Sequence, residues 1–247
     1  MLYREKRLIF VHVPKVAGQS IEHAFLADAG ADWESREPFL LSRNVDSAKG
    51  PPRLAHLLAR DYVRCGHIEQ PDFDAFYKFT FVREPLSRAL SMYKYEHADQ
   101  KMAFRDYLED YLPDRISGSD NYFHRPQSDY ITDGDGRVIV DFIGRFENLA
   151  EDFARVCGAI GMANTRLPHV NKTQKAAGDL VAENAGLMQR LRHRAATMKR
   201  LLRQSGREAP AHYRAPTLSE ARSDGRVLAA VQTVYAADYE QFGYPKM

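Results

Sequence analysis

The chain has 247 residues, with 35 basic and 33 acidic side chains and a formal net charge of +2. This length suits one α/β domain or two small ones, and the balanced charge argues against a dedicated nucleic-acid-binding protein. The two cysteines form no CxxC pair, which argues against a disulfide framework or a structural zinc site. No apolar run approaches the roughly 20 residues that a membrane span needs.

The first predicted unit is a strand at Leu8 to Val11, a loop at Pro14 to Ser20 and a helix that follows. A strand, loop and helix in this order point backbone N–H groups and a helix N-terminus at one place, which attracts phosphate or sulfate. Lys15 adds a positive charge, and Gly18 lets the backbone approach a ligand closely. The loop is not a Walker A motif, because the lysine precedes the glycine instead of following it.

The segment after this helix is polar and rich in turn-forming residues, so we expect a long loop over 30–52. A short helix is predicted at 53–60. The next segment, 61–67, is interpreted as a short strand that carries His67 at its carboxyl end.

A second unit of the same kind begins with a predicted strand at 77–82. Arg83 follows at once, and Pro85 suits the first turn of an amphipathic helix that continues to about residue 97. Arginine is a rigid bidentate donor for phosphate, and Ser91 on the helix supplies a hydroxyl. This unit therefore predicts a second anion site.

The rest of the chain predicts further alternation of strands and helices. We expect a helix at 102–112, an irregular segment at 113–126, a small hairpin around Asp133-Gly134-Asp135-Gly136, a strand at 141–146, a helix from Asn148 to Ile160, a helix at 181–204 and a last helix interrupted near Asp224-Gly225. This alternation indicates a mostly parallel sheet with ligands at its carboxyl edge.

The two anion-binding units resemble those of PAPS-dependent sulfotransferases, in the branch of carbohydrate (heparan-sulfate-type) O-sulfotransferases. His12 to Ser20 is similar to the 5′-phosphosulfate loop of that family, with Val16 and Gln19 as departures. Phe81 to Tyr93 resembles its 3′-phosphate motif at every defining position. The resemblance implies a P-loop-like three-layer α/β fold, with residues 1–247 as one domain whose C-terminal portion from about 175 is helical.

The resemblance implies a transfer of a sulfuryl group from PAPS to a carbohydrate hydroxyl, with release of PAP and without a metal. Its donor-binding residues would be Pro14, Lys15, Val16, Ala17, Gly18, Gln19, Ser20, Arg83, Ser91, Lys172 and Thr173. Lys15 would also be catalytic, because it neutralises charge on the leaving phosphate oxygen.

Sulfuryl transfer to a hydroxyl also needs a base, and histidine is the usual one. Several members of the family carry this base in a Gly-His step between the two nucleotide motifs, and Gly66-His67 matches that place. Glu69 is the alternative base. His12 faces either the acceptor or the core.

The acceptor itself is not identified by the sequence. Position alone suggests substrate contacts at His12, Glu69, Lys94, His97 and Arg125. A kinase-like P-loop phosphotransferase and a nucleotide- or glycan-binding protein without turnover are the alternatives. Without an N-terminal apolar segment, we expect a cytoplasmic, bacterial enzyme with no membrane span and no nucleic-acid partner; its oligomeric state is open.

Overall fold

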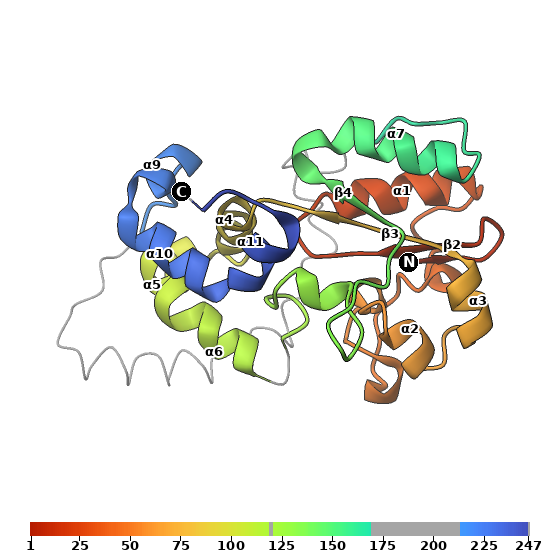
Figure 1. Ribbon diagram of the computed structural model, residues 1–247, viewed down its shortest axis with the longest axis horizontal. Coiled ribbons are helices and arrows are strands. Elements are labelled where there is room, and N and C mark those ends of the chain that lie inside the picture. The colour runs from red at the N-terminus through yellow and green to blue at the C-terminus, as the bar shows by residue number, and fades with distance from the viewer. Residues whose placement is uncertain (119–120, 169–212, 247) are drawn as a thin grey trace.

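The computed structural model describes residues 1–118, 121–168 and 213–246, and its centre is a four-stranded sheet (Figure 1). The strands are β1 (Leu2–Tyr3), β2 (Leu8–Val11), β3 (Tyr77–Val82) and β4 (Phe142–Arg145), in that spatial order. β1 is antiparallel to β2, and β2, β3 and β4 are parallel. The prediction of a mixed α/β fold with a mostly parallel sheet is confirmed.

Helices cover both faces of this sheet (Figure 1). Helices α1 (Gly18–Asp28) and α7 (Leu149–Ala159) lie on one side, where the rings of Phe25 and Phe153 meet edge to face with centroids 5.7 Å apart. Helices α2 (Asp61–Arg64) and α3 (Gln70–Ala75) lie on the other side. Strand β2 is buried throughout, which explains its uninterrupted apolar sequence.

A second hydrophobic core is built from helices alone and lies beside the sheet (Figure 1). Helix α4 (Pro85–Tyr95) runs from the end of β3 into this core, where Met92 and Tyr93 are fully buried. The other helical segments there are α5 (Phe104–Asp106), a π-helical turn (Tyr107–Tyr111), α6 (Leu112–Ser117), α9 (Leu218–Ser223) and α10 (Gly225–Val234). Helix α11 (Ala236–Phe242) returns to the sheet, because Tyr239 and Phe242 belong to the first core.

Four local predictions are wrong. The segment 61–67 is not a strand: Cys65 N–H donates to Asp61 O, and Gly66 ends the helix with φ +70°, a conformation that glycine adopts at low cost. Residues 113–117 are helical, because Pro113 sits in the first turn of α6, where it needs no N–H partner. The 53–60 helix is a single 3₁₀ turn, Leu54–His56. Asn148, three residues before Glu151, matches a capping-box pattern but makes no side-chain cap on α7.

The long loop over 30–52 contains the 3₁₀ turns Glu37–Phe39 and Ser47–Lys49, and the hairpin near Asp133 is a turn closed by the single bridge of Thr132 with Val138. The predicted helix 181–204 lies outside the described residues. In the described part of the chain, no helix combines the length and the apolar character needed to cross a membrane.

Candidate functional site

The loop between β2 and α1 has a strained backbone. Lys15 and Ala17 have φ angles of +72° and +69°, a region that side-chain-bearing residues rarely adopt and that is frequent at functional sites. The N–H groups of residues 15–19 donate to no acceptor among the described residues, whereas those of Ser20 and Ile21 bond to Ala17 O. The loop thus presents a series of free donors at the start of α1, the arrangement that binds anionic oxygen.

His12 packs beneath this loop. Its Nδ1 lies 2.6 Å from Glu22 Oε1, and both side chains are buried. The imidazole lies against Gly18, where a Cβ atom would stand only 1.9 Å from His12 Nε2. Position 18 therefore requires glycine for lack of space. The buried His12 ring also stacks on Phe10, and its centroid lies 4.5 Å from that of the His56 ring.

Lys15 lies in a desolvated position beside helix α4. Its Nζ is 4.0 Å from the centroid of the Tyr95 ring, a cation–π contact. Burial, followed by the nearby charge of Arg83, lowers the pKa of Lys15 to about 8, and Glu96 opposes that shift. This ammonium is therefore a poorly solvated charge that a bound anion would stabilise.

Arg83 comes from the second predicted unit and meets the first. Its Nη1 donates to the carbonyl oxygen of Lys15 at 3.3 Å, and its guanidinium lies 4.1 Å over the ring of Phe146. The Nε atom is buried and has no hydrogen-bond partner. Neither Arg83 nor Lys15 forms an ion pair with a carboxylate among the described residues. Two cations that form no direct ion pair within the described residues thus lie close together at the carboxyl edge of the sheet.

The side-chain amide of Gln127 holds the backbone of Arg83 through two hydrogen bonds. Its N–H donates to Gln127 Oε1 at 2.9 Å, and Gln127 Nε2 donates to its carbonyl oxygen at 2.8 Å. The N–H of Gln127 in turn donates to Asp238 on helix α11. Sequence reasoning missed this role of Gln127 and Asp238, because only the folded chain brings residues 83, 127 and 238 together.

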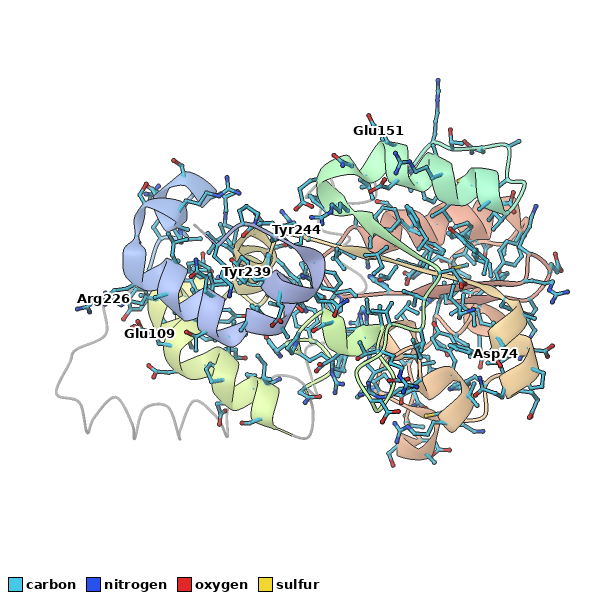
Figure 2. The ribbon with its side chains drawn as sticks, viewed as in Figure 1. Asp74, Glu109, Glu151, Arg226, Tyr239 and Tyr244 are labelled. Carbon is cyan, nitrogen blue, oxygen red and sulfur yellow. The ribbon has the colours of Figure 1, made fainter. Side chains whose placement is uncertain are left out.

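Two glutamates flank Arg83 and are held by the C-terminal segment. Glu84 caps helix α4 and accepts a hydrogen bond from Tyr239 at 3.4 Å, and Glu147 accepts one from Tyr244 at 3.0 Å. Figure 2 labels both tyrosines. The Glu84 N–H donates to Glu147 at 2.8 Å, so the turn after β3 is rigid.

Arg88 lies within the segment Phe81 to Tyr93 and has a structural role. It is fully buried, its Nε donates to Pro14 O at 3.2 Å, and its Nη2 donates to Arg125 O at 3.1 Å. It therefore ties the start of the anion loop to the segment around residue 125. Ser91 lies one turn further along α4, half-buried, and its hydroxyl makes no hydrogen bond within the described residues.

His67 does not meet the loop in this structure. Its carbonyl oxygen accepts from Arg4 at 2.6 Å, and Arg4 belongs to the turn that enters β2 at its amino end. Lys15 follows the opposite end of the same strand. The ring of His67 is held by the carbonyl oxygen of Lys49, 2.7 Å from Nε2. Glu69, the alternative base, is exposed at the start of α3.

The remaining predicted residues divide into three groups. Lys94 and His97 are exposed at the end of α4, and His97 has a φ of +51°. Arg125 is half-buried, bonds to Asn121 and lines a pocket of about 300 Å3. Lys172 and Thr173 lie outside the described residues.

His56 lines the same pocket, and sequence reasoning did not predict it as a functional residue. It is buried, and its Nδ1 lies 3.0 Å from the carbonyl oxygen of His12. A signal was available, because His56 is the one polar residue in the apolar run from Leu54 to Ala59. Such a run with a single polar side chain indicates a buried hydrogen-bonding group.

Comparison with known proteins identifies the family of the chain. A protein of Archaeoglobus fulgidus described as uncharacterized is 33% identical over 94 residues, which are 36% of this chain and 72% of that protein. No solved structure matches the chain significantly. The sequence matches a family model described as "Sulfotransferase family" over residues 1–245. With a match of that length, the chain belongs to the sulfotransferase family.

Proposed function

We propose that the protein is an O-sulfotransferase that moves a sulfuryl group from PAPS to a hydroxyl of a carbohydrate and releases PAP. Membership of the sulfotransferase family supports sulfuryl transfer, and the family generally takes PAPS as donor. The resemblance of the two nucleotide motifs to those of carbohydrate O-sulfotransferases supports the carbohydrate acceptor. We treat residues 1–247 as one domain with a P-loop-like fold.

The observation that carries the proposal is the contact between Lys15 and Arg83. Each follows a parallel strand, and the Arg83 guanidinium donates to the Lys15 carbonyl oxygen. Their two positive charges lie close enough for Arg83 to lower the pKa of Lys15. A ligand with two separate anionic ends, such as a 3′-phosphorylated nucleotide with a 5′-phosphosulfate, fits this pair of sites.

The residues present fit such a donor. The free N–H groups of residues 15–19 and the Lys15 ammonium would hold the 5′-phosphosulfate. The Arg83 guanidinium and the hydroxyl of Ser91, which makes no hydrogen bond within the described residues, would hold the 3′-phosphate. Lys172 and Thr173 are proposed as further contacts to the nucleotide, by the resemblance of their segment.

The proposed reaction is an in-line displacement at sulfur. The acceptor oxygen forms a bond to sulfur while the bond from sulfur to the phosphate oxygen breaks, and the electron pair stays on that oxygen. Lys15 stabilises this growing negative charge in a partly desolvated position, where electrostatic interactions are strongest. The acceptor proton passes to a base, for which the sequence offers His67 and Glu69.

Nucleotide titration tests the donor site. Calorimetry with PAP and with ATP, each in the presence and absence of Mg²⁺, separates a sulfotransferase from a kinase-like enzyme. We expect PAP to bind tightly without Mg²⁺ and ATP to bind more weakly, because ATP lacks a 3′-phosphate for Arg83. Tighter binding of ATP than of PAP would contradict the proposal.

The acceptor class needs a transfer assay. The protein is incubated with PAPS labelled in the sulfuryl group and a panel of unsulfated glycans, tyrosine peptides and lipid-linked sugars. Label in a glycan product supports the carbohydrate assignment. Label in a peptide alone contradicts it and indicates a peptide acceptor. Binding of PAP without transfer to any member would favour a binding protein.

A further inference from the structure

His56 lies next to the anion loop in a fixed orientation. Its Nδ1 is 3.0 Å from the carbonyl oxygen of His12, two residues before the loop begins. A carbonyl oxygen can only accept a hydrogen bond, so Nδ1 must carry the proton. In the neutral ring, the lone pair that can take up a proton is therefore on Nε2.

The ring of His56 lines a pocket whose walls are attached to the loop. Tyr122 stacks on His56 with ring centroids 5.9 Å apart, and Arg125 lies on the same pocket. Arg88 bonds the carbonyl oxygens of both Arg125 and Pro14, which fixes this wall to the residue directly before Lys15. Within the described residues, Nε2 of His56 has no hydrogen-bond partner.

The surroundings of His56 favour its neutral form. Burial, and next the neighbouring His12, hold the pKa of His56 well below 6.5. The Arg53 side chain and the N-terminal ammonium act in the same direction, and the His12 carbonyl oxygen opposes them. A histidine in this state has an unprotonated nitrogen at neutral pH, which a general base requires.

His67 differs from His56 in the partners of its ring and its backbone. Its Nε2 is engaged with the carbonyl oxygen of Lys49, so that nitrogen carries the proton. Its backbone is bonded to Arg4, in the turn at the amino end of β2, whereas the anion loop follows the carboxyl end. His56 is therefore bonded directly to the residue that leads into the anion loop, whereas His67 makes no such bond within the described residues.

We propose that Nε2 of His56 is the general base of the transfer, an inference that rests on the proposed sulfotransferase function. Nε2 takes the proton of the acceptor hydroxyl as that oxygen bonds to sulfur, and PAP leaves with the electron pair of the broken bond. The imidazolium keeps its Nδ1–H on the His12 carbonyl oxygen, which stabilises the new charge. The pocket beside Tyr122 and Arg125 then receives the acceptor.

The first test compares three histidine variants in the labelled-PAPS assay, with the acceptor that gives most product. Since general bases contribute roughly 10²–10⁴-fold, we expect His56→Gln to lower kcat at least about 100-fold. The glutamine amide can still donate to His12 O, so PAP affinity should stay within about threefold. The matched control is His23→Gln, because His23 lies in the middle of α1 and stacks on Trp33. A normal kcat in His56→Gln, or a loss confined to His67→Gln, overturns the inference.

The second test needs no acceptor. Nitrogen-15 NMR of the histidine rings at pH 7, assigned with the His56→Gln variant, reports the protonation of each ring nitrogen. We expect His56 to be neutral with the proton on Nδ1. A proton on Nε2 at pH 7 overturns the inference even where PAP binding and transfer are normal. Failure of PAP to bind would instead count against the proposed function, so the two failures are distinguishable.

Discussion

The carboxylate of Asp238 accepts the backbone N–H of Gln127 at 2.9 Å, and the two residues are 111 positions apart in the chain. The same carboxylate accepts the Ser128 N–H at 2.9 Å and its hydroxyl at 3.1 Å. Asp238 is fully buried and lies 4.0 Å from Arg88. Because Gln127 holds the backbone of Arg83, the Asp238 side chain on helix α11 helps to position a residue of the proposed donor site.

We expect Asp238→Asn to destabilise the protein and to weaken PAP binding. Asparagine keeps the size of the side chain, but its NH2 group replaces an acceptor oxygen and would face a backbone N–H group. The substitution also removes the negative charge beside Arg88. The loss of a buried acceptor costs about 1–3 kcal/mol of unfolding free energy. Urea denaturation measures it, with the exposed Glu240→Gln on the same helix as control. Equal stability of both variants would contradict this role.

Gly18→Ala should disrupt the loop. The new methyl group would stand within 1.9 Å of the buried His12 ring, and overpacking of this kind typically costs about 1–3 kcal/mol. We expect a lower melting temperature and a PAP affinity reduced at least tenfold. Gly158→Ala is the control, because a Cβ there meets open space in helix α7. Adding His12→Ala to Gly18→Ala should recover part of the stability, and no recovery would show that the clash is not the cause.

PAP affinity should depend on pH through Lys15. The pKa of its ammonium is lowered to about 8 in the free protein, so the positive charge is present below that pH and is lost above it. A bound anion favours the charged form, and affinity should therefore fall as pH rises from about 8 to 9.5. In Lys15→Met we expect weaker binding that no longer changes over this range. Calorimetry at several pH values measures both, and the same slope in the variant would assign the titration to another group.

Arg83→Gln should weaken the binding of 3′-phosphorylated nucleotides selectively. Hydrogen bonds to charged groups contribute about 1.5–3 kcal/mol, which corresponds to a loss of about 10- to 150-fold in PAP affinity. The affinity for 5′-AMP, which has no 3′-phosphate, should change much less. Arg155→Gln on the exposed side of α7 controls for the loss of charge. An equal loss for PAP and 5′-AMP would mean that Arg83 acts only through its bond to the Lys15 carbonyl oxygen.

The sequence predicted well the parts of the site that are local. The strand at Leu8 to Val11 and the placement of Pro85 in the first turn of α4 are confirmed. The helix after the anion loop is also present, but it begins at Gly18, inside the loop predicted to extend to Ser20. In each case neighbouring residues determine the structure, through burial of a strand or the chemistry of a helix start. The meeting of Lys15 and Arg83 also follows, since both succeed parallel neighbouring strands.

The contacts between segments that are distant in the chain could not be predicted from the sequence. Tyr62 and Val63 favoured a strand, but Gly66 ends a helical turn there, and Tyr62 instead reaches Phe10 O with its hydroxyl at 3.1 Å. The bond of Gln127 to Arg83 and the bond of His56 to His12 join segments 44 residues apart, and no spacing rule encodes such pairs. The residues next to Asp238 likewise do not indicate that its carboxylate binds the segment at residue 127, which is 111 positions away.

Arg88 also bears on the order in which the site can form during synthesis. This one side chain bonds to Pro14 and Arg125 and faces Asp238, so it joins the beginning, the middle and the end of the chain. Contacts over such distances close late, because a long loop must be ordered before they form. A growing chain can complete the arrangement only after residue 238 has left the ribosome. The anion loop can therefore be fixed in this arrangement only after the segment around residue 238 has been synthesised, more than 200 residues later.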